Sequence, residues 1–242
     1  MKKVYLETYG CQMNVSDSER ISTTLASRGY ELTNIEDDAD VVIFNTCSVR
    51  EKAEQKLYTR VGHLRHADRP KPIVGVMGCV AQLEGETLFS KIEGVDFVLG
   101  TQAVGRVADA IARTLSTDEA IVDLGDREAD YNWTVADKHR HSPYIAFLPI
   151  IEGCNKFCTY CIVPFSRGRE RSLLASEIIR QVLDLMRNGV REVHLIGQNV
   201  NSYRPESDSG LEGFEGKSAF SKLLRAVAAT GIERIKFTTS FP

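Results

Sequence analysis

The sequence predicts an α/β protein: an N-terminal open parallel βα sheet domain, residues 1–125, followed by the first part of a β/α barrel, residues 144–242. Strand-like segments alternate with amphipathic helical segments, which indicates a mainly parallel sheet covered by helices. The polar segment 126–143 has no clear hydrophobic period, so we interpret it as a linker. After the linker the alternation resumes with a longer period, as in a β/α barrel.

The first half contains four strand-then-helix units. Residues 2–9 alternate and are rich in β-forming side chains, which predicts a strand. Ser16 and Glu19 have the spacing of a capping box, which predicts a helix from there to about Arg28. The other predicted strands of this half are residues 40–45, 72–78 and 96–100, and the clearest later helix is residues 104–115.

The second half repeats the pattern with longer connections. Its predicted strands are residues 143–153, 191–197 and 233–240, and its predicted helices are residues 175–189 and 218–231. Three strands are too few to close a barrel, so we expect only the N-terminal portion of one in this chain.

Composition excludes several classes of protein. The formal net charge of −3 indicates no overall basic character, so any nucleic-acid contact requires a local basic patch. The longest apolar stretches have strand length, and charged or polar residues interrupt the N-terminus, so we expect no signal peptide, no membrane partner and a cytoplasmic location. In that reducing compartment, cysteines are more often ligands or catalysts than disulfides.

Three of the six cysteines each follow a predicted strand: Cys11, Cys47 and Cys79. Because the carboxyl ends of parallel strands meet at one edge of a sheet, we expect these distant thiols to converge there as metal ligands. The alternative is three buried structural cysteines. Packing alone gives no reason for all three to end strands, so we favour the metal site.

The other three cysteines, Cys154, Cys158 and Cys161, have the spacing C-x3-C-x2-C after another predicted strand. A short loop can place three such thiols around one metal centre. A structural zinc site needs a fourth ligand, and no cysteine follows in the next turn. The histidines that we consider as a fourth zinc ligand are His139, His141 and His194.

A four-iron, four-sulfur cluster held by three cysteines keeps one iron without a protein ligand, whereas full coordination takes four cysteines. A catalyst has a use for that open iron, because a substrate or cofactor can bind it. The same reasoning applies to both sets of cysteines, so the sequence predicts two [4Fe-4S] clusters, each with an open iron.

Several ordered motifs make a family resemblance specific over nearly the whole chain. They are "YGCQMN", "NTCSVRE", "GCNKFCTYCIVPFSRGRERS", "GQNVNSY" and "FTTS". Together they resemble the tRNA methylthiotransferases of the MiaB type, within the radical S-adenosylmethionine superfamily. A single C-x3-C-x2-C motif would resemble only the superfamily.

The resemblance implies an enzyme that inserts a methylthio group at carbon 2 of isopentenyl-modified adenosine at position 37 of tRNA. The Cys154, Cys158 and Cys161 cluster would bind S-adenosylmethionine and cleave it to a 5′-deoxyadenosyl radical, which removes hydrogen from that carbon. The Cys11, Cys47 and Cys79 cluster would deliver sulfur, and a second S-adenosylmethionine the methyl group. The implied partners are tRNA, an electron-donor protein and a sulfur source, and we expect a monomer.

The resemblance also suggests residues that bind the cofactor. Tyr160 would lie near the adenine of S-adenosylmethionine. Gln198 and Asn199 follow the second barrel strand, Ser240 follows the third, and all three would donate or accept hydrogen bonds to the cofactor. The alternative for these polar side chains is simple solvation in loops.

Arginines beside the cysteine loop suggest an RNA contact. Arg167, Arg169 and Arg171 are spaced two residues apart, and guanidinium groups suit both phosphates and splayed bases. The alternative is a solvated charge run, because Glu170 dilutes the positive charge.

The chain also departs from the family pattern. Phe241 stands where relatives usually have histidine, and the rest of the barrel and a C-terminal RNA-binding module are expected to be absent. Two alternatives within the family are a methylthiotransferase for ribosomal protein S12 and one for another modified tRNA adenosine. The alternative from another class is a non-catalytic zinc or iron–sulfur protein.

Overall fold

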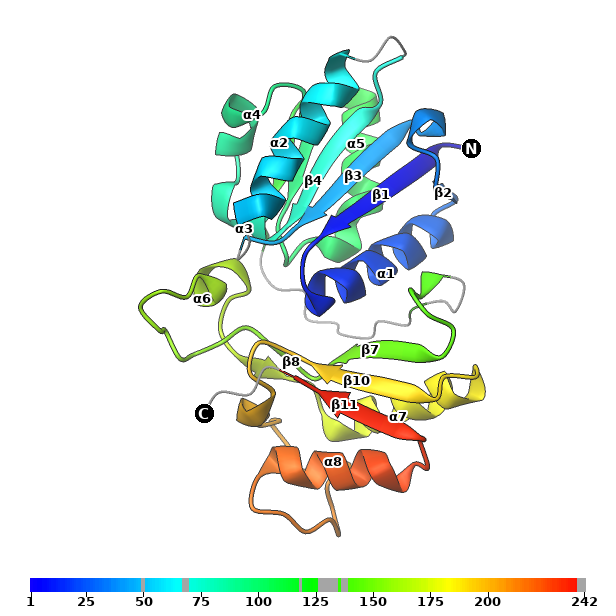
Figure 1. Cartoon of the computed structure of the whole chain (residues 1–242), viewed down its shortest axis with the longest axis vertical. Coiled ribbons are helices and arrows are strands. Elements are labelled where there is room, and N and C mark those ends of the chain that lie inside the picture. The colour runs from blue at the N-terminus through cyan, green and yellow to red at the C-terminus, as the bar shows by residue number, and fades with distance from the viewer. Residues whose placement is uncertain (49–50, 67–69, 118, 126–134, 136–138, 239–242) are drawn as a thin grey trace. The chain divides into compact units, whose positions relative to one another are not determined.

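The computed structural model describes residues 1–48, 51–66, 70–117, 119–125, 135 and 139–238 (Figure 1). The chain forms two compact units, Met1–Trp133 and Thr134–Pro242. The boundary between them falls inside the segment 126–143 that was predicted as a linker.

The first unit contains a parallel sheet, as predicted. Its six strands have the order β2-β1-β3-β4-β5-β6 among the described residues. Their bounds are β1 Lys3–Tyr9, β2 Glu31–Thr33, β3 Val41–Thr46, β4 Ile73–Gly78, β5 Phe97–Leu99 and β6 Ile121–Asp123. The order reverses between β1 and β3, which is the point where open α/β sheets bind ligands.

Helices cover both faces of this sheet (Figure 1). They are α1 Gln12–Ser27, α2 Glu51–His66, α3 Cys79–Glu84, α4 Thr87–Lys91 and α5 Val107–Thr117, with short 3-10 turns η1 Glu36–Asp38 and η2 Val104–Arg106. Buried side chains of α1 and α5 form one hydrophobic cluster with the sheet, and those of α2, α3 and α4 form a second. Neighbouring residues of β3 join opposite clusters: Ile43 the first and Phe44 the second. This central strand is therefore apolar on both faces.

The start of α1 corrects a sequence prediction. The helix begins at Gln12, with Cys11 as its N-cap, so it starts four residues before the predicted cap at Ser16. Ser16 and Glu19 lie within the helix and are buried. The prediction was wrong because Asn14, rather than Glu19, supplies the side chain that accepts the N-cap hydrogen bond. The short strands β2 and β6 were not predicted; each has only three residues.

The second unit has a three-stranded parallel sheet in its described part, with the order β11-β10-β7. The strands are β7 Ile145–Pro149, β10 Glu192–Ile196 and β11 Arg234–Phe237, and the two main helices are α7 Ala175–Arg187 and α8 Ala219–Ala229. Shorter elements are α6 Val163–Ser166, η4 Val200–Ser202 and an antiparallel pair of β8 Ile151–Glu152 with β9 Arg171–Ser172. Helices α7 and α8 lie on the same side of the sheet, as in a β/α barrel (Figure 1).

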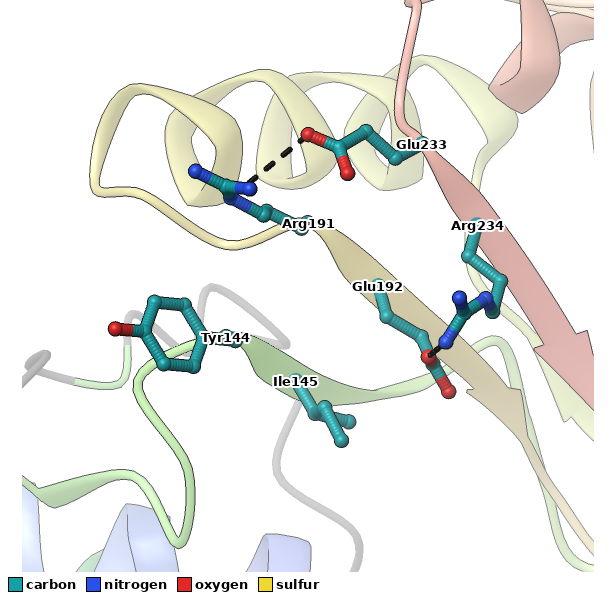
Figure 2. Close-up of a pocket in the computed structure, with 6 residues that line it drawn as sticks. All are labelled: Tyr144, Ile145, Arg191, Glu192, Glu233 and Arg234. Carbon is teal, nitrogen blue, oxygen red and sulfur yellow. Dashed lines mark hydrogen bonds and ion pairs between the residues drawn. The ribbon is translucent and has the colours of Figure 1, made fainter.

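Ion pairs join the strands of the second unit where β10 and β11 begin. Arg234 donates to Glu192 at 2.6 Å, and Arg191 lies 3.8 Å from Glu233. These side chains and Tyr144 line a cavity of about 250 Å³ (Figure 2). This edge is opposite to the carboxyl ends of the strands. At the amino-terminal end of the strands of a β/α barrel, side chains generally contribute to stability rather than to catalysis.

The close packing of β4 against β5 can be tested at Gly75. A Cβ atom at this position would collide with the ring of Phe97, which is fully buried. We expect Gly75→Ala to lower the free energy of unfolding by about 1–3 kcal/mol, because the core has no space for the added methyl group. Urea unfolding of the whole chain measures the change.

Gly62→Ala is the matched control, because a Cβ atom there meets no other atom within 4 Å and Gly62 lies inside α2. We expect that change to be neutral or to stabilise by about 0.5–1 kcal/mol. Equal unfolding midpoints for the two variants would show that β4 and β5 are not packed as described.

Candidate metal centres

The register of the first sheet brings three cysteine segments to one edge. Tyr9 of β1 pairs with Thr46 of β3, and Thr46 pairs in turn with Gly78 of β4. The backbone N–H of Cys47 donates to the carbonyl of Tyr9 at 2.8 Å, so the hydrogen bonding between the two segments continues one residue past the end of β3. The residues that come one or two positions after this aligned row are Cys11, Cys47 and Cys79.

These three cysteines lie in two kinds of surroundings. Cys47 and Cys79 are buried, with 3% and 5% of their surface exposed, whereas Cys11 is exposed. Cys11 is the N-cap of the 16-residue helix α1, and Cys79 is the first residue of α3. The positive end of a helix favours the thiolate form that binds metals.

The second cysteine segment is a loop that follows β8, and its start lies against the segment that leads into β9. The N–H of Cys154 donates to the carbonyl of Gly168 at 3.1 Å. Gly153 has a φ of +73°, and a Cβ atom there would collide with the carbonyls of Gly168 and Arg169. Only glycine fits this close approach without a backbone shift, so the loop requires glycine at position 153.

The other two thiols of this loop lie nearer to its surface. Cys158 and Cys161 are half-buried, and a turn joins them in which the N–H of Cys161 donates to the carbonyl of Cys158 at 2.9 Å. Phe157 has a φ of +48°, which is uncommon for a residue with a bulky side chain. Sequence reasoning missed this strained residue, because a phenylalanine gives no signal of a left-handed conformation.

Gln198 lies at the same sheet edge as Cys154. The pairing of Ile196 with Pro149 aligns the ends of β10 and β7. A Cβ atom at Gly197 would lie 2.6 Å from the carbonyl of Ile151, so the segments that follow β10 and β7 pass close to each other. The side-chain oxygen of Gln198 is buried and accepts no hydrogen bond from the described residues. It is therefore available to a ligand that donates one.

The remaining predicted cofactor residues differ in their surroundings. Asn199 is 3% exposed and donates from its side-chain amide to Ser202 at 2.7 Å, so it is held within its own loop. Tyr160 is 90% exposed, which suits a ring that stacks on a ligand. Ser240 lies outside the described residues.

The three arginines beside the loop do not share one environment. Arg169 is exposed and Arg171, in β9, is half-buried. Arg167 is 3% exposed and faces the buried carboxylate of Glu152 at 3.9 Å. This burial differs from the solvated position that the sequence indicated for Arg167, and its RNA contact stays a prediction. The run Arg-x-Arg-x-Arg indicated a solvated surface, and only the fold separates its first member from the others.

The donor chemistry of both centres fits iron–sulfur clusters. The described part of the chain contains no group of three or more His, Cys, Asp or Glu side chains placed to hold a single metal ion. A four-iron cube presents its irons at separate corners, so its thiolate ligands need not converge on one point. Three soft thiolates in each set match that requirement.

His194 is not placed as a fourth ligand for zinc. Its Nε2 atom lies 2.5 Å from the carboxylate of Glu192, and its ring packs edge-on against Phe147 with 5.2 Å between ring centroids. The glutamate in turn has its pKa held below the usual range, first by the hydrogen bond with His194 and then by the one with Arg234. His194 therefore belongs to a structural network in the sheet.

Two family models match the chain, one in each unit. Residues 3–100 match a model described as "Uncharacterized protein family UPF0004", and residues 148–240 match the radical SAM superfamily. No helix in the described ranges is long and apolar enough to cross a membrane.

Curated relatives are similar over the whole chain. The tRNA-2-methylthio-N(6)-dimethylallyladenosine synthase of Koribacter versatilis is 41% identical over 100% of this chain and 53% of its own length. The proteins of the same name from Thermosipho melanesiensis and Salmonella arizonae are 43% and 42% identical, again over the whole chain. The chain spans about half the length of these relatives.

Solved structures resemble the fold at low sequence identity. The cobalamin-dependent S-adenosylmethionine radical enzyme OxsB matches 98% of this chain and 38% of its own, with a TM-score of 0.55 and 14% identity. The radical S-adenosylmethionine methyltransferase TsrM from Kitasatospora setae matches 84% of this chain and 48% of its own, with a TM-score of 0.53 and 13% identity. These matches support the arrangement of strands and helices and nothing finer.

The parallel sheet of the second unit, the cysteine loop after β8 and the matching family model define a radical SAM domain. The identity over the whole chain is more specific. Over its whole length the chain is similar to relatives named tRNA-2-methylthio-N(6)-dimethylallyladenosine synthase, the MiaB-type family that its sequence motifs resemble.

Proposed function

We propose that the protein to which this chain belongs is a radical SAM methylthiotransferase that acts on isopentenyl-modified adenosine at position 37 of tRNA. The observation that supports it most is the pairing of β1, β3 and β4, which sets Cys11, Cys47 and Cys79 at one sheet edge in addition to the C-x3-C-x2-C loop. The names of the relatives support the reaction and the substrate.

Each centre in this proposal has its own residues. Cys11, Cys47 and Cys79 would hold one [4Fe-4S] cluster, and Cys154, Cys158 and Cys161 would hold the other. When bound, the clusters and S-adenosylmethionine supply the radical and sulfur-transfer chemistry, which belongs to the cofactors rather than to the side chains. The protein positions them.

The chain's own residues bind and orient. The buried side-chain oxygen of Gln198 accepts a hydrogen bond from the amino or hydroxyl groups of S-adenosylmethionine, and Tyr160 presents an exposed ring to its adenine. Gly153 lets the cysteine loop lie directly on the backbone of Gly168, which fixes where Cys154 emerges. Asn199 and Ser240 keep their proposed roles as further cofactor contacts.

Arg169 and Arg171 support an RNA contact beside the radical SAM loop. Arg169 is exposed, and Arg171 is half-buried in the strand that returns from the loop. Guanidinium groups bind phosphates and stack on unpaired bases. The proposed partners otherwise remain an electron-donor protein and a sulfur source, with the protein acting as a monomer in the cytoplasm.

The substrate can be tested in a strain that lacks the gene. We expect mass spectrometry of its tRNA nucleosides to show isopentenyladenosine in place of the methylthio form, with ribosomal protein S12 unchanged. The gene restored on a plasmid should recover the methylthio nucleoside, and the same gene with Cys154→Ala should not. Loss of a modification from S12 alone would show that the ribosomal protein is the substrate.

The number of clusters can be counted directly. We expect the anaerobically purified chain to be brown and to contain about eight irons, given two four-iron centres. Replacing either cysteine trio by alanines should lower the content to about four irons, because the other trio is untouched. A colourless chain with stoichiometric zinc, or one trio whose removal changes nothing, would contradict the two-cluster proposal.

The RNA contact can be tested at Arg169. We expect Arg169→Ala to weaken tRNA binding and to reduce the slope of log affinity against log salt by about 1, because one phosphate contact is lost. Arg187→Ala is the control, since Arg187 is 75% exposed on α7, away from the loop. Fluorescence anisotropy at several salt concentrations provides the measurement. Equal slopes for both variants and the parent would rule out a phosphate contact at Arg169.

A further inference from the structure

Two buried asparagine side chains pair beneath the first cysteine trio. Asn14 is in the first turn of α1 and Asn45 is in β3, and they are 0% and 1% exposed. The side-chain nitrogen of Asn14 donates to the side-chain oxygen of Asn45 at 3.2 Å. The side-chain nitrogen of Asn45 donates back to the backbone carbonyl of Asn14 at 2.8 Å. We call these two residues the amide pair.

The amide pair contacts the segments that contain all three cysteines. The oxygen of Asn14 accepts a hydrogen bond from the N–H of Cys11 at 3.3 Å. Asn45 belongs to the strand that ends just before Cys47. Gly78, which directly precedes the third cysteine, has a φ of +94°, and a Cβ atom there would lie 2.5 Å from the oxygen of Asn45. One buried pair therefore touches three loops that are distant in the sequence.

The surroundings fix which end of each amide faces which neighbour. The backbone carbonyl of Asn14 can only accept a hydrogen bond, so the side-chain atom of Asn45 that faces it must be the nitrogen. The other end of Asn45 is then its oxygen, which requires the nitrogen of Asn14 opposite. The side-chain oxygen of Asn14 consequently faces Cys11, where both the backbone N–H and, at 3.4 Å, the thiol donate to it.

Two hydroxyl groups extend the network away from the cysteines. The nitrogen of Asn45 also donates to Ser18 at 2.9 Å, and the hydroxyls of Ser18 and Thr8 lie 2.7 Å apart. Thr8 is the register partner of Asn45 in the neighbouring strand. Every polar group of the amide pair therefore has a partner, which makes the pair rigid, since a buried amide that rotates would lose hydrogen bonds.

We propose that Asn14 and Asn45 are positioning residues for the Cys11, Cys47 and Cys79 centre. Their paired amides hold the three cysteine segments in register and keep the oxygen of Asn14 against the sulfur of Cys11. This inference rests on the proposed function only in assigning a cluster to this trio. It concerns how the protein builds the centre and sets its electron affinity.

The orientation of Asn14 has an electrostatic consequence. The side-chain oxygen is the negative end of the amide dipole, and the Cys11 thiol donates a hydrogen bond to it at 3.4 Å. When the sulfur loses this proton to bind iron, the same oxygen faces a negatively charged sulfur. Adding an electron there is less favourable than beside an apolar group, because hydrogen bonds and charges around the sulfurs set the potential of a cluster. Removing this oxygen should raise the reduction potential of the centre.

The experiment uses the whole chain with Cys154, Cys158 and Cys161 replaced by alanine, so that only the first trio can hold iron. In this parent, Asn45→Leu removes the partner that fixes Asn14, and Asn14→Leu removes the oxygen itself. After anaerobic reconstitution, we expect both variants to lose iron to a chelator about tenfold faster than the parent, the size typical of second-layer changes around a metal. We expect Asn14→Leu to raise the midpoint potential in a redox titration followed by electron paramagnetic resonance.

Two further variants separate positioning from general loss of stability. Thr114→Val removes a buried hydroxyl in α5 that bonds to the Ala110 carbonyl, away from the cysteines, and should change neither iron loss nor potential. Ser18→Ala removes only an outer link of the network and should give iron loss between the parent and Asn45→Leu. If circular dichroism of the iron-free chain shows that a leucine variant does not fold, the rate of iron loss from Ser18→Ala tests whether the amide pair positions the cysteines.

The outcomes distinguish this inference from the proposed function. A parent that binds no iron overturns the proposed first cluster, and the inference with it. A parent that holds iron, with asparagine and serine variants that match it in chelator resistance and potential, overturns the inference alone. Faster iron loss in the asparagine and serine variants, with Thr114→Val unchanged, supports the amide pair as a positioning device.

Discussion

The parallel hydrogen bonding of β1, β3 and β4 is the constraint on which the first candidate centre depends. Its three cysteines are more than thirty residues apart in sequence, so no local segment can bring them together. The row of Tyr9, Thr46 and Gly78 fixes where each strand ends, and a slip of one residue in any pair would turn side chains to the opposite face. The apolar side chains on both faces of the sheet stabilise this register, because a slip would also move side chains out of the two hydrophobic clusters.

The two centres are built by different physical means. In the second, the cysteines lie within eight residues, and the loop is shaped by glycine and by hydrogen bonds to its own return strand. In the first, a helix start, a sheet and a buried pair of amides cooperate. A local loop depends on a few backbone conformations, whereas an edge assembled from three strands depends on the stability of the whole unit. Changes far from the cysteines can therefore affect the first centre more than the second.

Polar groups buried beneath the sheet edge are part of this design. Asn14 and Asn45 are almost fully buried, and each of their side-chain oxygens and nitrogens has a hydrogen-bond partner. A buried polar group without partners destabilises a fold, but one with all its partners restricts the core to a single arrangement. Both asparagines lie beside cysteine segments, where the direction of a side chain decides which ligand it can help to place.

The alternation of strands and helices, the two-part organisation, the family resemblance and the two sets of cysteines could all be predicted from the sequence. These features depend on hydrophobic period and on short motifs, which are local properties of the chain. The sequence prediction misplaced the start of α1, because the capping pattern at Ser16 and Glu19 is also compatible with a buried helix interior. It also missed β2 and β6, which are too short for a period to be visible.

The burial of polar residues and the contacts that they make could not be predicted from the sequence, because both depend on how distant segments pack together. The arginine run has a uniform pattern, yet Arg167 is enclosed and Arg169 is exposed, because the loop folds back on β8. The motif that ends in Asn14 gives no sign that its amide reaches Asn45, since that contact joins residues 31 positions apart. Local sequence sets which side chains are available, and the strand register sets which of them meet.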